Sequence, residues 1–408
     1  MSERVERLIE NCAAIFGANL VDASVAIADG RVVAVGAARE IAGAYRAAER
    51  IDGAGKLLTP GFVDSHTHIV FAGDRSDEFV RRCQGVSYQQ IAAAGGGIRA
   101  TVRATRQASE EQLYELALPR LIRMLSLGTT TIEIKSGYGL NLETELRMLR
   151  VIRRLGEELP VTVVATFMGA HEIPDEYRTD RNGYIDFLCE TAIPAVAAEQ
   201  LAKFCDVFCE QDVFTAAESE RILTAGRAAG LEPKIHADEL TLSGGSRVAA
   251  DVHAVSADHL MMIDDDGIER LKTANVVPTL LPGTTFFLGK QTYAPAGKML
   301  SAGLQIALAT DRNPGSCTIE SLQFICGLAC LRMGLTPEQA LEAATAHGAR
   351  ALGLSATHGR IVAGQRADLI LWDAPAPAHV VYEFENILPR TVFVAGKPVF
   401  GMQPERRN

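Results

Sequence analysis

Two histidines lie two positions apart in the run Val-Asp-Ser-His-Thr-His at residues 63–68. In an extended strand, side chains two apart point to the same side, so His66 and His68 can offer two imidazole nitrogens to one metal ion. A metal held by imidazoles and a carboxylate, with one position left open, activates water near neutral pH. Two histidines also fall at this spacing by chance, so the hypothesis depends on further ligand-type residues.

Such residues follow other strand-like runs of the chain. They are His171, His236, His259 and Asp311, which end or follow the runs 161–168, 232–237, 252–258 and 305–310. A lone histidine at a strand end more often bonds a neighbouring carbonyl, but a set that converges on one place favours a metal centre. The four remaining histidines are expected to be structural or solvated: His253 inside the run 252–258, and His347, His358 and His379 in helices or loops.

The elements that would position these residues alternate along the middle of the chain. Eight strand-like runs cover residues 61–67, 128–135, 161–168, 204–210, 232–237, 252–258, 275–281 and 305–310. Helical patterns separate them, for example at residues 110–125 and 142–155, and another covers 337–352. This alternation predicts an α/β fold, a TIM (β/α)8 barrel, whose catalytic residues come from the C-terminal ends of several strands.

Both ends of the chain are rich in short β-type runs punctuated by Gly, Asp and Pro. We expect the two terminal segments to pair into one small β-sandwich domain. The predicted division gives residues 1–58 and 359–408 to the sandwich and residues 59–358 to the catalytic barrel.

Composition limits the classes of protein that the chain can belong to. Of its 408 residues, 48% are hydrophobic and 22% are charged, which is typical of a globular protein. The net charge of −10, without a basic run, argues against nucleic acid as a partner. Without an apolar run of roughly 18 to 20 residues or a signal peptide, we expect no membrane contact and a cytoplasmic location, with the eight cysteines reduced.

The motif set resembles the amidohydrolase superfamily. It comprises Pro-Gly-Phe-Val-Asp-Ser-His-Thr-His at 60–68, the histidines after the fifth and sixth strands, the aspartate after the eighth, and Gly-Gln-Arg-Ala-Asp-Leu-Ile-Leu-Trp-Asp at 364–373. The resemblance implies a metal-dependent hydrolase in which His66, His68, His236 and Asp311 are the metal ligands. Asp311 would also receive a proton from the activated water, and His259 would polarise the substrate carbonyl or hold the water.

The number of metal ions is a separate question. Binuclear members of the superfamily carry a bridging lysine at the end of strand 4, where this chain has Glu210. We therefore expect one divalent or trivalent metal per subunit, Zn²⁺ or Fe³⁺, with Glu210 as a bridging ligand kept as the alternative. Lys135 ends the second strand, where a substrate-facing or helix-facing role is expected rather than a carbamate.

A narrower resemblance is to the imidazolonepropionase family. It rests on the strings at residues 71–79, 95–98, 133–140, 167–172, 236–239 and 310–316. It implies hydrolytic opening of the ring of 4-imidazolone-5-propanoate, a small-molecule substrate, to N-formimidoyl-L-glutamate in histidine degradation.

The same resemblance implies roles for residues outside the metal shell. Arg75 and Tyr138 would hold the propanoate, and His171 would contact the ring. Glu239 would bond a ring nitrogen and shuttle protons, although the pattern also admits glutamine there, and Asp311 or Glu239 would protonate the leaving nitrogen. The substrate or product would also touch three residues after the last strand, Asn313, Gly315 and Ser316.

Two competing functions share this barrel. A metal-dependent deaminase of cytosine or guanine type needs no arginine for a propanoate, so Arg75 and Tyr138 argue against it, and a scaffold without catalysis would show gaps among the ligands. The long segment 73–100, with a helix-like piece at 77–82 and a glycine triplet at 95–97, is expected to act as a lid. A homodimer is expected from the resemblance alone.

Overall fold

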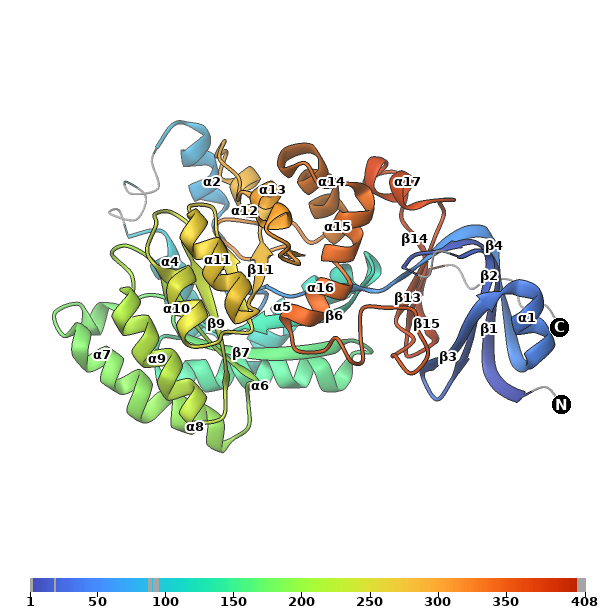
Figure 1. Cartoon of the computed structure of the whole chain (residues 1–408). Coiled ribbons are helices and arrows are strands. Elements are labelled where there is room, and N and C mark those ends of the chain that lie inside the picture. The colour runs from blue at the N-terminus through green and yellow to red at the C-terminus, as the bar shows by residue number, and fades with distance from the viewer. Residues whose placement is uncertain (1–2, 18–19, 87–89, 91–94, 402–408) are drawn as a thin grey trace.

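Eight parallel strands form a barrel in the middle of the chain (Figure 1). The computed structural model describes residues 3–17, 20–86, 90 and 95–401. The barrel strands are β5 (Phe62–Asp64), β6 (Thr129–Lys135), β7 (Thr162–Ala170), β8 (Phe204–Cys209), β9 (Glu232–Ala237), β10 (Ser256–His259), β11 (Val277–Leu280) and β12 (Ala307–Leu308). Each strand pairs in parallel with the next along the chain, so the predicted TIM barrel is confirmed.

Helices connect the strands and cover the outside of the barrel (Figure 1). The longer ones are α4 (Ile98–Gln107), α5 (Glu110–Ser126), α6 (Leu142–Glu158), α9 (Ala216–Ala228), α11 (Asp265–Ala274) and α14 (Leu322–Met333). The shorter ones are α2 (Ser76–Cys83), α7 (Arg181–Phe187), α8 (Ile193–Ala198), α10 (Gly245–Asp251), α12 (Pro282–Phe287), α13 (Ala296–Ser301), α15 (Pro337–Ala343), α16 (Ala346–Ala351) and α17 (Pro377–Tyr382). Helix α1 (Ala38–Ala44) lies apart from the barrel and packs against the strands at Leu20–Ala28 and Arg31–Ala37. Capping boxes at Ser109 and Thr215 fix where α5 and α9 begin, because each side chain accepts from the backbone three residues on.

Several predicted elements differ from the observed ones. The first and last barrel strands are shorter than the runs 61–67 and 305–310, so His66 and His68 follow β5 and do not lie within it. The run 252–258 becomes strand only from Ser256, because Val252 ends α10 and His253 has a φ of 49° in the turn that follows. The sequence predicted His253 inside a strand, but the residue is exposed in a turn. The helix predicted over 337–352 is broken at Thr345, whose hydroxyl donates back to the carbonyl of Leu341.

The two ends of the chain build a second, separate sheet beside the barrel (Figure 1). Its seven strands, in spatial order, are β15 (Lys397–Gly401), β14 (Pro389–Val394), β13 (Leu369–Trp372), β4 (Tyr45–Pro60), β1 (Glu3–Ile15), β2 (Leu20–Ala28) and β3 (Arg31–Ala37). Strand β4 joins the two halves, pairing in parallel with β1 and antiparallel with β13. The expected small domain made from both terminal segments is thus confirmed.

The sheet leads directly into the barrel. Only Gly61 separates β4 from β5, and a Cβ there would come within 2.1 Å of Thr130 Oγ1, so no larger residue fits. Trp372 packs its ring edge against Phe62 at 5.8 Å and donates its indole N–H to Thr59 Oγ1 at 2.9 Å. Because β4 runs past residue 58, the exact domain boundaries at 58/59 and 358/359 stay a prediction.

The segment between the first strand and the second is only partly described. Helix α2 covers the helix-like piece expected at 77–82, and α4 starts directly after Gly97. Residues 87–89 and 91–94 lie outside the described residues, so the lid stays a prediction. All eight cysteines are free. In the part of the chain that the structure describes, we find no helix that combines the length and apolarity needed for a membrane span.

Candidate metal centre

The first and last barrel strands hold the histidine pair beside Asp311. The amide of Asp311 donates to the carbonyl of His66 at 3.0 Å, and the amide of His68 donates to the carbonyl of Arg312 at 2.9 Å. Thr67 and Arg312 form a parallel bridge between these two bonds. The backbone that closes the barrel therefore also fixes three candidate ligands against one another.

Their ligand atoms form a compact triangle. His66 Nε2 lies 3.3 Å from His68 Nε2 and 3.5 Å from Asp311 Oδ1, and His68 Nε2 lies 3.7 Å from Asp311 Oδ1. Ligand atoms around a tetrahedral zinc ion, at bonds of about 2.0–2.2 Å, stand ~3.4 Å apart. The triangle has the dimensions of one face of such a site.

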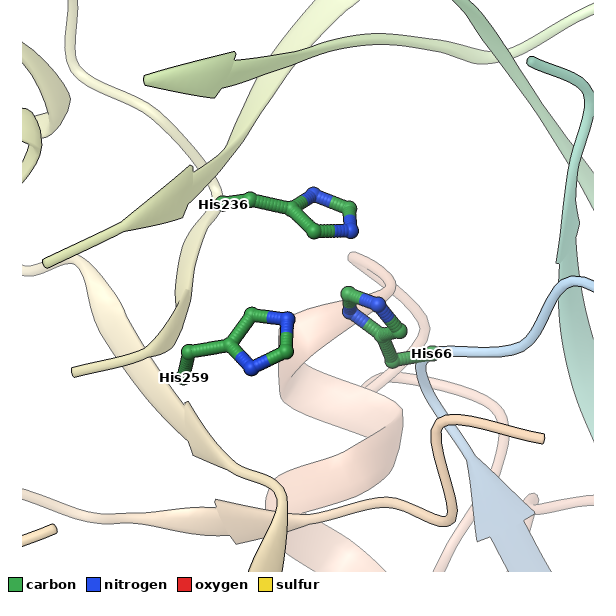
Figure 2. Close-up of side chains that lie close together, drawn as sticks. All are labelled: His66, His236 and His259. Carbon is green, nitrogen blue, oxygen red and sulfur yellow. The ribbon is translucent and has the colours of Figure 1, made fainter. Parts of the chain in front are cut away.

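Two further histidines approach from the neighbouring strands β9 and β10. Figure 2 shows the rings of His66, His236 and His259 pointing toward one another. One nitrogen from each ring lies within 4.8 Å of the others, and the ring centroids of His66 and His236 are 4.4 Å apart. His66 belongs to this group and to the triangle with His68 and Asp311, so one buried centre gathers five side chains that the sequence singled out.

The protonation of these rings suits a metal. Burial lowers the pKa of His66, His68 and His259 well below the usual histidine value, and nearby positive groups lower it further. Burial also opposes the charged form of His236, but Asp206 outweighs it and raises the pKa of that ring. Because metals bind the neutral imidazole, three of these four rings need lose no proton to become ligands.

Two buried carboxylates orient two of the rings from behind. His66 Nδ1 lies 2.6 Å from Asp258 Oδ2, and His236 Nδ1 lies 3.0 Å from Asp206 Oδ1. An ionised carboxylate only accepts, so each Nδ1 carries the proton and each Nε2 lone pair faces the centre. Among the described residues, His68 Nδ1 has no such partner.

A hydroxyl that sequence reasoning missed fixes Asp311. Thr284, in α12, donates its hydroxyl to Asp311 Oδ2, which leaves Oδ1 facing the two histidines. Burial raises the pKa of Asp311 to about 7, and the bond from Thr284 opposes that rise. Burial and the bond from Thr284 therefore act on the Asp311 carboxyl in opposite directions, and burial has the larger effect.

Tyr138 and His171 line the side of the centre next to His68. The His171 ring stacks on that of His68 with centroids 5.2 Å apart, and the Tyr138 ring lies 5.3 Å from His171. His171 Nδ1 lies 3.0 Å from the carbonyl of Gly137, and burial lowers the pKa of His171 to about 3. The structure brings both residues, which come from different strand ends, beside the candidate ligand His68.

Arg75 lies in the segment after the first strand, next to the turn that follows Asp311. Its Nε and Nη2 donate to Glu78 Oε2 at 3.0 and 2.8 Å. Its guanidinium also lies against Gly315, where a Cβ would stand only 2.1 Å from Nη1. Glu78 Oε1 in turn accepts from the amide of Gly97 at 2.8 Å.

The turn after β12 is braced by Asn313. Its Oδ1 accepts from the amides of Gly315 and Ser316, both at 2.8 Å, and its Nδ2 donates to the carbonyl of Asp311 at 2.8 Å. These bonds hold Gly315 and Ser316 beside the ligand Asp311. Whether the Asn313 side chain also contacts substrate stays a prediction.

Glu239 lies just beyond β9, beside His259 at the end of the neighbouring strand β10. Its Oε2 is 3.7 Å from His259 Nε2, and burial raises its pKa. A carboxyl that holds its proton more tightly than usual suits donation to a leaving nitrogen.

Comparison with known proteins places this geometry in a family. The amidohydrolase family model matches residues 57–399. The imidazolonepropionase of Shouchella clausii is 52% identical over 349 residues, which cover 86% of this chain and 78% of that protein. The imidazolonepropionase of Myxococcus xanthus is 47% identical over 385 residues, which cover 94% and 91%. The chain belongs to the imidazolonepropionase branch of the amidohydrolase family.

Solved structures carry the same amidohydrolase architecture. An adenosine deaminase from Xanthomonas campestris with bound zinc aligns with a TM-score of 0.72 at 18% identity, covering 99% of this chain and 95% of that one. A 5-methylcytosine deaminase from Klebsiella pneumoniae aligns with a TM-score of 0.77 at 17% identity, covering 98% and 100%. At these identities the likeness concerns the fold alone.

Two residues questioned by the amidohydrolase pattern lie away from the ligand triangle. Lys135 is fully buried and donates to Glu133 Oε1 at 2.6 Å and Asp206 Oδ2 at 2.8 Å, so the expected substrate-facing or helix-facing role is wrong. Glu210 accepts from the amide of Leu240 at 2.7 Å and bonds Thr241, and none of the candidate metal groups in the described residues includes it.

The motifs that resemble imidazolonepropionases did not indicate the buried charges beneath the candidate ligands. The positions of charged residues within predicted strands could have indicated them. Lys135, Asp206, Lys234 and Asp258 each lie within a run that the sequence predicts as a barrel strand, and all four are fully buried. A charge in such a place is costly unless it is paired, so several on neighbouring strands indicate one ionic cluster. The histidines His347 and His358 make structural bonds elsewhere, as expected.

Proposed function

We propose that this centre hydrolyses a carbon–nitrogen bond in the ring of 4-imidazolone-5-propanoate and yields N-formimidoyl-L-glutamate. The observation that carries the proposal is the triangle of two imidazole nitrogens and one carboxylate oxygen, in a chain about half identical to imidazolonepropionases. A homodimer and a cytoplasmic location stay predictions from the sequence. Deaminase chemistry has support only from fold neighbours below 20% identity.

We assign His66, His68, His236 and Asp311 as ligands of one metal ion, Zn²⁺ or Fe³⁺. The donor set supports this assignment, because imidazole nitrogens with one carboxylate suit both metals. When bound, such a metal lowers the pKa of water and polarises a carbonyl oxygen.

The remaining side chains supply orientation and proton transfer. The carboxyl group of Asp311 receives the proton of the attacking water, and its raised pKa supports that role. His259, whose ring faces His66 and His236, polarises the ring carbonyl. Glu239, buried 3.7 Å from His259, delivers a proton to the leaving nitrogen. Arg75 and Tyr138 hold the propanoate, and His171 packs on the ring.

Activity is expected to depend on metal. Purified protein of known metal content should remove the ring chromophore of 4-imidazolone-5-propanoate without releasing ammonia. Dialysis against a chelator should abolish the reaction, and added Zn²⁺ or Fe³⁺ should restore it. Persistence of the chromophore with a full complement of metal would contradict the proposed function, and release of ammonia would indicate a deaminase instead.

Substitution Gly315→Ala is expected to weaken substrate binding. Alanine suits the backbone at this position, but its Cβ would overlap Arg75 Nη1 and push the guanidinium aside. A displaced positioning group should raise KM by about tenfold or more, with a smaller change in kcat. The matched control is Gly297→Ala, because a Cβ at Gly297 meets no atom within 4 Å. A KM equal to that of the unchanged protein would show that Arg75 does not need its observed position.

A further inference from the structure

A cluster of charged side chains fills the barrel beneath the candidate ligands. It consists of Glu133 and Lys135 from β6, Asp206 from β8, Lys234 from β9 and Asp258 from β10, all fully buried. Three carboxylates face two ammonium groups, so the cluster carries one net negative charge when all are ionised. The proposed reaction uses none of these groups directly, yet burial of so many charges is costly unless each is paired.

Lys135 occupies a particular place in this cluster. Its Nζ lies 2.8 Å from Asp206 Oδ2 and 3.8 Å from Asp258 Oδ2, and these are the two carboxylates that hold metal-site histidines. Asp206 uses its other oxygen, Oδ1, for His236 Nδ1 at 3.0 Å. Asp258 Oδ2 lies 2.6 Å from His66 Nδ1. The ammonium group of Lys135 thus lies near both carboxylates that hold the rings of His66, which follows β5, and His236, which lies in β9.

The second buried lysine makes different contacts. Lys234 Nζ donates to the carbonyl of Ser65 at 2.9 Å and lies 3.7 Å from Glu133 Oε1 and from Asp258 Oδ2, so it approaches Asp258 as closely as Lys135 does. It does not bond Asp206 in the described structure. Lys135 and Lys234 therefore share burial, charge and an approach to Asp258, but among the described residues only Lys135 bonds Asp206, the support of His236.

We propose that Lys135, Asp206 and Asp258 form one positioning unit, which holds His66 and His236 in the ring orientation and the Nδ1–H tautomer that direct both Nε2 atoms at the metal. The inference rests on the proposed ligand set and adds residues that touch neither metal nor substrate. Partners behind a ligating histidine typically change metal affinity by about 10- to 100-fold when they are removed.

Zinc affinity of the metal-free protein tests the proposal. Competition with a chromophoric chelator should give a Kd that is about 10- to 100-fold weaker for Lys135→Met. Lys234→Met removes the same charge from the same cluster and leaves the bond between Lys135 and Asp206 in place, so its Kd should stay within about threefold of that of the unchanged protein. Equal weakening in the two variants would mean that only the net charge of the cluster matters, which overturns the proposal.

A double substitution separates position from charge in a second way. Lys135→Met with Asp206→Asn returns the cluster to its original net charge but leaves His236 without its anionic support. We expect the Kd to stay weak and the two effects to be non-additive, since both changes act on one unit. Recovery of the original affinity would overturn the proposal. If Lys135→Met does not fold, Asp206→Asn alone decides, because unchanged zinc affinity in that variant contradicts the positioning unit.

The tautomers of His66 and His236 provide a second test, because a Lys135 that only stabilised the fold would not change them when it is replaced. In protein labelled with ¹⁵N-histidine, His66 and His236 should show the Nδ1–H tautomer, and Lys135→Met should show a mixture of tautomers. Ile152→Ala, a buried change on α6, controls for lost stability: it should lower Tm and leave the zinc Kd unchanged. Tautomers in Lys135→Met identical to those of the unchanged protein would contradict the proposal.

Failure of the ligand assignment would look different. His66→Ala and His236→Ala should lose zinc binding if the proposed centre is right, and unchanged binding in both would refute the centre itself. Loss of binding in those two variants together with an unchanged Kd in Lys135→Met and Asp206→Asn would refute only the positioning unit.

Discussion

Asp311→Asn is expected to lower kcat by roughly a thousandfold, in the range measured when a general acid or base is lost. Asparagine keeps the size of the side chain and an oxygen at the ligand position, but it cannot receive a proton from water. Thr284 would still hold one side of the group. The measurement is kcat at saturating substrate, with the bound metal quantified in the same preparation.

The control for Asp311→Asn is Asp251→Asn, an exposed aspartate at the end of α10. That variant should keep the activity of the unchanged protein. Asp311→Asn with a full metal content and unchanged kcat would contradict the role of Asp311 in proton transfer. Loss of both metal and activity would retain Asp311 as a ligand, and added Zn²⁺ would then separate the two roles.

Arg75→Met is expected to raise KM by about a hundredfold, because a charge-assisted pair with a carboxylate is lost in a buried place. Methionine fills part of the space, so the surrounding turn at Gly315 should keep its shape. Glu78 would lose its bonds with the guanidinium and keep the bond from the amide of Gly97, so its negative charge would no longer be balanced by Arg75, which adds to the loss. The kcat should fall less than kcat/KM, since Arg75 binds a part of the substrate that does not react.

A substrate analogue sharpens this prediction. An imidazolone that carries an ethyl group in place of the propanoate should react equally poorly with the unchanged protein and with Arg75→Met. Arg153→Met, an exposed change on α6, should leave both KM values as they are. If Arg75→Met lowers kcat at constant KM, the guanidinium acts on the chemical step and not on the carboxylate.

The barrel and the ligand candidates could be predicted from the sequence because their signals are local. Apolar runs alternate with helical periods, and polar side chains stand where each run ends. Because the parallel strands of a barrel all end at one rim, the sequence alone predicts that His66, His236 and Asp311 lie close together. The structure confirms that convergence at distances that suit a metal.

The supports of those ligands depend on pairing across strands, which no single segment reveals. Lys135 looked substrate-facing because it ends a strand, but the barrel turns its side chain inward to Asp206, which lies 71 positions later in the chain. Thr284 belongs to a helix start without any motif, and only the fold brings it to Asp311. The start of β10 was misplaced because β-branched and apolar residues at 252–255 suit a helix end and turn equally well.

Strand β4 has a consequence for the order in which the protein assembles during synthesis. Its edge toward β13 is satisfied only by residues about 300 positions later in the chain. At about 5 to 20 residues per second, a ribosome needs roughly 15 to 60 s to deliver that partner. During this interval the nascent chain carries an open strand edge directly before β5, the strand that His66 and His68 follow. We therefore expect the emerging chain to be most prone to self-association, and to need chaperone protection, until the last strands leave the ribosome.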